Sequence, residues 1–247
     1  MNAGQSARYT AAFNKTLPPM LFKIFTYVST FSQAVLLLNA LILLWKFKSI
    51  PEKVRAIWPY IIIALLTEII SRGLALLEYP NLFLLHIYTL LEFLTWSFFY
   101  RRVFQDNKRF QTIFPWAVAV IAVLLIGNSI FLEPLNTFNS NAKTLVQVAL
   151  ISYGVYYLFE AFGKTDLTKP TQRAVILINF AVILYYSGSL FIFMFSKFLA
   201  SQHVDQSWQR MMWVINALLV GLFQVLIFFG LWPFVFGKKN NVHDREG

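Results

Sequence analysis

Residues 57–104 read IWPYIIIALLTEIISRGLALLEYPNLFLLHIYTLLEFLTWSFFYRRVF, and this stretch decides the fold. It holds two apolar segments, each long enough to cross about 30 Å of hydrocarbon as a helix that rises about 1.5 Å per residue. Only Pro80 and Asn81 separate the segments, so we expect a tight antiparallel hairpin. Charged residues interrupt both segments. Because such residues are costly at membrane depth, they usually face a bundle interior, a cavity or a partner.

The rest of the chain repeats this pattern of long apolar segments. Of its 247 residues, 58% are hydrophobic and 13% are charged, whereas soluble domains are about 25% charged. We therefore expect an all-α, polytopic membrane protein that forms a single domain, a bundle of seven transmembrane helices. The predicted spans are 24–45, 57–79, 82–104, 114–132, 143–163, 173–197 and 210–236.

The basic residues are distributed unequally between the two sides of these spans. One side carries fourteen: Lys46, Lys48, Lys53, Arg55, Arg101, Arg102, Lys108, Arg109, Lys164, Lys169, Arg173, Lys238, Lys239 and Arg245. The other side carries six: Arg8, Lys15, Lys23, Lys143, Lys197 and Arg210. The positive-inside rule then predicts an N-terminus outside and a C-terminus inside. The basic N-terminal tail mildly opposes this orientation.

A group of charged residues marks the predicted hairpin. Glu68 lies 12 residues before Pro80 and Glu92 lies 11 residues after Asn81, so the two carboxylates should lie at similar depth. Arg72 follows Glu68 at the i, i+4 spacing that favours an ion pair, and His86 lies nearby on the next span. Because Lys143 is counted above with the loops of one side, Glu92 has no expected basic partner in any span except His86. We expect a protonated Glu92, a proton shared with Glu68, a protonated His86 or a bound cation.

Other polar residues extend this predicted centre. Asn128, Gln147, Ser187 and Asn216 fall at mid-depth or in the outer half of their spans. Inner-half polar residues such as Asn39 and Asn179 are fewer, which favours a pocket that opens outward. The same residues could instead form interhelical hydrogen bonds, and the charged group could be a structural ion pair, a ligand or ion site, or a catalytic site.

Several chemistries have no candidate residues in this chain. It has no cysteine and only three histidines, of which His203 and His243 lie outside the predicted spans. A catalytic zinc needs three protein ligands, so we expect no metal site and no cofactor. The net charge of +10 arises from short loops beside the spans, where basic residues set orientation and meet lipid headgroups. Nucleic acid is therefore not an expected partner.

Three short segments carry a family resemblance. They are Leu135-Asn136-Thr137-Phe138-Asn139-Ser140, Ser187-Gly188-Ser189 and Trp213-Val214-Ile215-Asn216. With them the chain resembles small seven-helix membrane proteins of Bacteroidota-type bacteria. The resemblance implies a location in the inner membrane and brings no known activity.

These observations favour a sensory, receptor-like protein that binds a small ligand or responds to protons at its polar centre. Its partners would be the lipid bilayer, that ligand or ion, and a cytoplasmic signalling protein at the basic inner loops. The alternatives are a proton-coupled transporter or channel subunit and a structural membrane subunit. An enzyme is not expected, although a lipid-modifying membrane enzyme is a further alternative.

Overall fold

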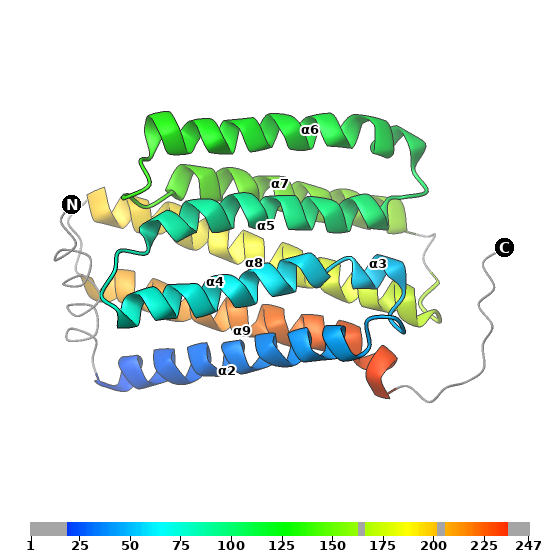
Figure 1. The fold of residues 1–247 in the computed structure, drawn as a ribbon, viewed down its shortest axis with the longest axis horizontal. Coiled ribbons are helices and arrows are strands. Elements are labelled where there is room, and N and C mark those ends of the chain that lie inside the picture. The colour runs from blue at the N-terminus through cyan, green and yellow to red at the C-terminus, as the bar shows by residue number, and fades with distance from the viewer. Residues whose placement is uncertain (1–18, 163–165, 202–205, 237–247) are drawn as a thin grey trace.

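All regular secondary structure in the described part of the chain is helical. The computed structural model describes residues 19–162, 166–201 and 206–236 (Figure 1). The elements are α2 (Pro19–Trp45), α3 (Glu52–Arg55), α4 (Trp58–Leu76), α5 (Leu82–Val103), α6 (Lys108–Gly127), the π-helix η1 (Asn128–Leu132), α7 (Ser140–Ala161), α8 (Pro170–Ser201) and α9 (Gln206–Phe236). Within these residues, seven helical segments are long and apolar enough to cross a membrane. The predicted all-α fold and number of spans are confirmed, and insertion and orientation stay predictions.

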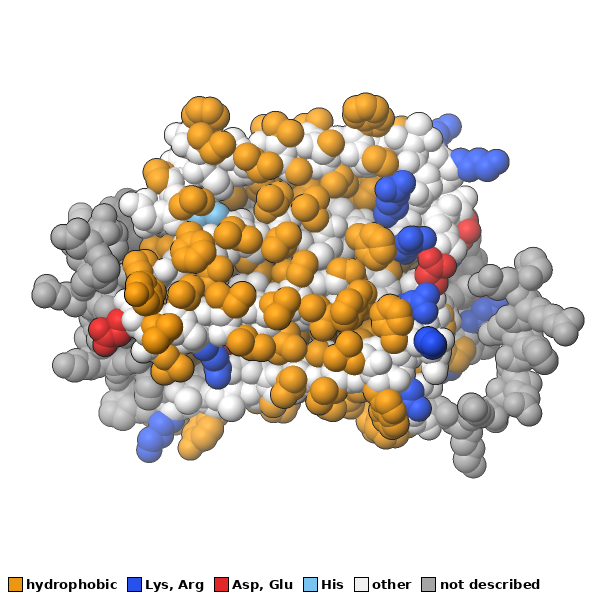
Figure 2. Space-filling view, in the orientation of Figure 1, with side chains coloured by type: hydrophobic (Ala, Val, Ile, Leu, Met, Phe, Trp, Pro, Cys, Tyr) orange, Lys and Arg blue, Asp and Glu red, His pale blue; other side chains and the backbone are white. Residues whose placement is uncertain are grey.

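The helices pack side by side in one bundle. α8 contacts both α7 and α9, α9 also packs on α2, and α4 and α5 lie side by side (Figure 1). α6 lies at the edge of the bundle, against α5. The interior contains large aromatic side chains that are almost completely buried, among them Trp96, Tyr100, Tyr186 and Phe223. Exposed apolar side chains cover the flanks, as expected of a lipid-facing surface (Figure 2).

The hairpin between α4 and α5 forms where the sequence predicts it. α4 ends in a Schellman motif, in which the Glu78 N–H donates to the Ala75 carbonyl and the Tyr79 N–H donates to the Leu74 carbonyl. Glu78 adopts a left-handed φ of 57° to make this turn. Pro80 follows, and a proline after such a motif prevents the helix from continuing.

The predicted fourth span starts too late. α6 begins at Lys108, six residues before the predicted 114, because Asn107 caps its first turn by accepting a hydrogen bond from the Phe110 N–H at 3.0 Å. Lys108, Arg109 and Gln111 are polar, so hydropathy alone does not include them in a span. Near its other end α6 continues into η1, and the two together cover Lys108–Leu132.

The two ends of the bundle differ in charge. We call the end with α3 and the α5–α6 turn the α3 end, and the end with the α4–α5 turn and η1 the η1 end. On the face shown in Figure 2, Lys and Arg gather at the α3 end, as the sequence predicts. The tail residues Arg8, Lys15, Lys238, Lys239 and Arg245, as well as Lys164, His203 and His243, lie outside the described residues.

Candidate functional site

The centre of the bundle holds a buried ion pair. Glu92 on α5 is fully buried, and Lys143 on α7 is 7% exposed. Lys143 Nζ lies 2.5 Å from Glu92 Oε2, and the Tyr186 hydroxyl donates to Glu92 Oε1 at 3.0 Å. The expectation that Glu92 lacks a basic partner from another span was wrong. Lys143 supplies the counter-charge, so neither a protonated carboxyl nor a bound cation is needed to balance it.

The aromatic surroundings of Lys143 stabilise its ammonium group further. Lys143 Nζ lies 5.4 Å from the centroid of the Tyr88 ring and 6.0 Å from that of the Tyr186 ring. An ammonium over an aromatic face is attracted by the ring quadrupole. Glu92, Lys143 and Tyr186, on three different helices, therefore form a closed, neutral cluster, which we call the Glu92–Lys143 pair.

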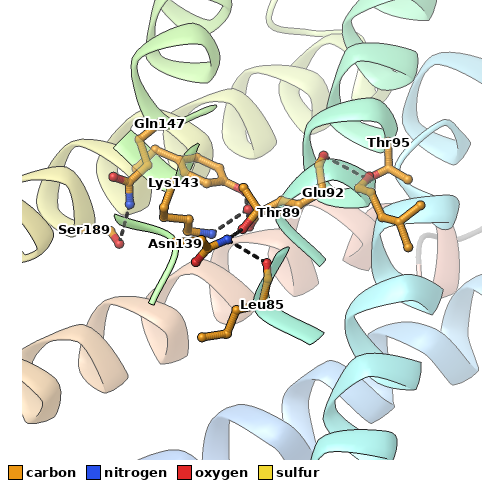
Figure 3. A network of polar contacts seen from close by, with 10 residues as sticks. Leu85, Thr89, Glu92, Thr95, Asn139, Lys143, Gln147 and Ser189 are labelled. Atoms are coloured by element: carbon orange, nitrogen blue, oxygen red, sulfur yellow. Dashed lines mark hydrogen bonds and ion pairs between the residues drawn. The ribbon is translucent and has the colours of Figure 1, made fainter. Parts of the chain in front are cut away.

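Lys143 reads as a loop charge in the sequence because it lies in the first turn of α7. The fold directs it inward together with Asn139 and Gln147, which lie four residues before and after it and share its face. Figure 3 shows this row beside α5. Asn139 Nδ2 donates to the Leu85 carbonyl at 2.9 Å and to the Thr89 hydroxyl at 2.8 Å. The four-residue spacing of these polar residues is the signal that could have identified Lys143.

Glu68 and Arg72 belong to a second cluster. Glu68 Oε1 accepts hydrogen bonds from Arg72 Nε at 3.0 Å and from Gln33 Nε2 on α2. Arg72 in turn donates from Nη2 to Gln33 Oε1. The Arg72 and Glu68 side chains are 58% and 39% exposed, respectively. The predicted i, i+4 ion pair is present, but its interhelical contacts are to α2 and none of them reaches Glu92.

Glu68 also lines a cleft between α2, α4 and α9. The cleft has a volume of about 230 Å³. Its polar lining consists of Ser29, Ser32, Gln33, Glu68, Asn216 and Gln224, and its apolar lining includes Phe25 and Trp213. Buried Asn216 Oδ1 has no hydrogen-bond partner within the described part of the chain. We call this feature the α2–α4–α9 cleft.

His86 connects α5 to the η1 end. Its Nδ1 lies 2.9 Å from the Ser129 hydroxyl and its Nε2 lies 3.1 Å from the Thr137 carbonyl oxygen. Thr137 belongs to the 133–139 connection between η1 and α7. His86 therefore anchors this connection, and both of its ring nitrogens face Ser129 and Thr137 instead of Glu68, Arg72 or Glu92.

Glu133 organises the same connection. It accepts hydrogen bonds from Asn128 Nδ2 at 2.8 Å, from the Ser140 hydroxyl at 3.0 Å and from the backbone N–H of Asn141 at 3.0 Å. Burial alone would raise the pKa of Glu133, but these bonds and one from the Ala142 N–H together lower the pKa below its usual 4.5. Asn128 thus serves to hold a helix-capping carboxylate.

The remaining two predicted residues, Gln147 and Ser187, belong to neither polar cluster. Gln147 Nε2 donates to the Ser189 hydroxyl at 2.9 Å, which links α7 to α8 (Figure 3). The Ser187 hydroxyl donates to the Ile183 carbonyl at 2.6 Å on its own helix, and Ser187 is exposed. The eight predicted residues therefore divide among the buried pair, the Glu68–Arg72 cluster with its cleft, the η1 end, one bond between α7 and α8, and one bond within α8. No group of three His, Asp or Glu side chains among the described residues is arranged to hold a metal ion.

The seven long apolar helices indicate a multi-pass membrane protein. Comparisons of the chain with protein-family models, with curated proteins and with solved structures found no match. The resemblance to seven-helix proteins of Bacteroidota-type bacteria therefore stays a prediction.

Proposed function

We propose that this chain is a receptor-like protein of the inner membrane that binds a small polar molecule in the α2–α4–α9 cleft. The observation that carries the proposal is a cavity lined by six polar side chains among helices that are apolar enough to span a membrane. Small-molecule sites are concave, largely apolar and contain a few convergent polar groups. The cleft has this composition, whereas the Glu92–Lys143 pair is sealed inside the core.

The lining of the cleft suggests how a ligand would be held. Glu68 is already paired with Arg72 and Gln33, so its charge is balanced before a ligand arrives. Asn216 Oδ1 is an unsatisfied acceptor, and an unpaired buried acceptor costs about 1–3 kcal/mol. A ligand that donates a hydrogen bond to Asn216 Oδ1 would remove this cost. The same ligand would take the place of Gln33 beside Glu68.

Contacts around the cleft offer a route for a conformational response. Trp213 packs edge-on against Phe138 and Phe193, with centroid distances of 6.0 and 5.8 Å. Toward the α3 end, Asn39 Nδ2 donates to the Gln224 carbonyl at 3.0 Å and so joins α2 to α9. A ligand that moves α2 relative to α9 would shift the helix ends beside the basic loops, where a cytoplasmic partner would bind.

The contacts near Glu92 argue against the transporter alternative. A proton-coupled transporter would need a polar path that continues inward from Glu92 toward Asn39 and Asn179. Trp96, one helical turn beyond Glu92, is fully buried and packs against Tyr60, Phe223 and Tyr186. Asn179 is held by the Tyr100 hydroxyl at 2.8 Å, and Asn39 is bonded to Gln224. This aromatic layer separates the buried pair from the α3 end.

Thermal unfolding of the purified, detergent-solubilised protein tests the proposal. A panel of amino acids, polyamines, sugars, short carboxylates and nucleosides is added to wild type, Glu68→Gln, Asn216→Ala and the matched control Ser187→Ala. A ligand at about 100 times its Kd stabilises the folded state by about 2.7 kcal/mol. We expect at least one compound to stabilise wild type and Ser187→Ala and to lose its effect in both cleft variants. The proposal fails if no compound stabilises wild type, or if the cleft variants respond as the control does.

A further inference from the structure

A second concave surface lies at the α3 end, between the first turns of α8 and the last turns of α9. This groove has a volume of about 390 Å³ and is lined chiefly by Arg173, Leu177, Phe229, Trp232, Pro233 and Phe236. Its floor is closely packed, because a Cβ built on Gly230 would lie 3.2 Å from the Ile178 side chain and 3.4 Å from the Ala174 carbonyl oxygen. A side chain at position 230 would therefore require the Ile178 side chain to move by a few tenths of an ångström.

The groove lies where both apolar helices end. The membrane-spanning segments run over Pro170–Met194 and Met211–Phe236, so Arg173 is in the first turn of one and Phe236 is the last residue of the other. Phe229, Trp232 and Phe236 are 53%, 44% and 60% exposed. Tryptophan is enriched where hydrocarbon meets lipid headgroups, which favours this position for Trp232. The groove should therefore face the upper acyl chain and the headgroup of a lipid.

Arg173 is the charged residue of this groove. Its side chain makes one long hydrogen bond, from Nη2 to the Thr168 carbonyl at 3.4 Å, and no ion pair with any described residue. By contrast, Lys53 and Arg102 at the same end are paired with Asp106 and Glu52. A guanidinium has five N–H donors in a planar fork that matches a phosphate, and most of those of Arg173 remain available.

The acidic residue closest to Arg173 in the sequence is itself occupied. Asp166 Oδ1 accepts from the Thr168 hydroxyl at 2.6 Å and from the Thr168 N–H at 2.9 Å. These bonds, together with the nearby Lys169 charge, keep the pKa of Asp166 below its usual 3.8. Lys169 thus adds a second positive charge near Arg173. The Asp166 carboxylate accepts its hydrogen bonds from Thr168 and forms no ion pair with Arg173.

We propose that the α8–α9 groove binds an anionic phospholipid. Its phosphate would lie on Arg173 and the upper part of an acyl chain would lie along Phe229 and Trp232. A cationic headgroup amine is disfavoured because Arg173 lines the groove and Lys169 lies four residues before it. Basic pockets between membrane helices recognise anionic headgroups in this way. The proposal is independent of the ligand proposed for the α2–α4–α9 cleft.

Native mass spectrometry of the detergent-solubilised protein tests this site with phosphatidylglycerol, phosphatidylcholine and soluble glycerol phosphate. Wild type is compared with Arg173→Gln, with Trp232→Leu and with Arg109→Gln, a basic control outside the groove. We expect one phosphatidylglycerol to be retained in preference to phosphatidylcholine, and its affinity to fall about fivefold in Arg173→Gln. Trp232→Leu should also weaken it, and Arg109→Gln should not.

Four outcomes would overturn the proposal. The first is equal retention of the two lipids by wild type. The second is an Arg173→Gln variant that matches Arg109→Gln. The third is a dimer that dissociates on Trp232→Leu, because a second copy would then occupy the groove. Binding of glycerol phosphate as tightly as the lipid would assign the site to a free phosphate compound instead. Melting temperatures measured without added lipid show whether each variant is folded.

Discussion

At the scale of single residues, Lys143 supplies the positive charge that balances Glu92 in the bundle interior. Lys143 places its ammonium against Glu92, and both side chains are buried at the junction of α5, α7 and α8. Transfer of either charge from water is costly, and the close partner, the Tyr186 hydroxyl and the tyrosine rings beside Lys143 offset that cost. The Glu92–Lys143 pair therefore serves to specify how three helices meet, whatever the protein binds.

Removal of one member of this pair should be strongly destabilising. We expect Lys143→Met to lower the free energy of unfolding by about 3–5 kcal/mol, because Glu92 is left buried without a counter-charge. The double variant Lys143→Met with Glu92→Met should recover much of that loss. Lys53→Met, which breaks the exposed pair with Asp106, should cost about 1 kcal/mol or less. Denaturant unfolding at neutral pH measures all four proteins, and equal losses for the two single lysine variants would contradict this account.

At the scale of elements, the 133–139 connection determines how α7 begins. Both carboxylate oxygens of Glu133 accept from the Asn141 N–H, at 3.0 and 3.1 Å, and so satisfy the free donors of the first turn. His86 and Asn139 fasten the same connection to α5. The direction in which α7 enters the bundle, and with it the position of Lys143, follows from these contacts.

The capping carboxylate should make stability depend on pH in the acidic range. The folded-state pKa of Glu133 is below the unfolded value of 4.5, so its contribution is complete above that pH and is lost as pH falls through the folded pKa. Glu133→Gln should cost about 1 kcal/mol at neutral pH. The difference from wild type should shrink as pH decreases below about 4.5.

Thermal unfolding from pH 7 to pH 3 measures this effect, with Glu52→Gln as the control. Glu52 forms an exposed pair with Arg102, so its replacement should change stability by less than about 1 kcal/mol. A difference between wild type and Glu133→Gln that stays constant over the whole pH range would show that Glu133 does not act through its charge.

At the scale of the whole molecule, the unequal charge of the two ends predicts how the bundle is oriented. The basic residues around α3 and the α5–α6 turn would remain in the cytoplasm, and the η1 end would face outward. This orientation places the α2–α4–α9 cleft nearer to the outer surface and the α8–α9 groove in the cytoplasmic leaflet. The orientation therefore determines the side of the membrane on which each proposed site lies.

Cysteine labelling in intact cells measures that orientation directly, because the chain contains no cysteine of its own. Asp106 at the α3 end has a side chain that is 79% exposed, and Leu135 at the η1 end is 51% exposed. A membrane-impermeant maleimide should label Leu135→Cys in intact cells and Asp106→Cys only after permeabilisation. The reverse pattern would invert the topology, and labelling of both from outside would show that α6 does not span the membrane.

The sequence alone determined the number, order and approximate length of the seven long apolar helices, the hairpin at Pro80 and Asn81, and the unequal charge of the two ends. These properties depend on local hydropathy, helical rise and turn chemistry, all of which act between near neighbours in the chain. Glu68 and Arg72 were paired correctly for the same reason, since four residues along one helix bring side chains together.

Only the tertiary structure decided which polar groups meet across helices. Glu92 meets Lys143 and Glu68 meets Gln33 because of the rotation and depth at which each helix packs, and hydropathy does not encode either quantity. Lys143 lies at the junction of a loop and a helix, where the sequence pattern of a surface charge and that of a buried one are the same. The packing of α7 in the bundle decides that Lys143 is a buried charge, because it places the side chain against Glu92 and the tyrosine rings.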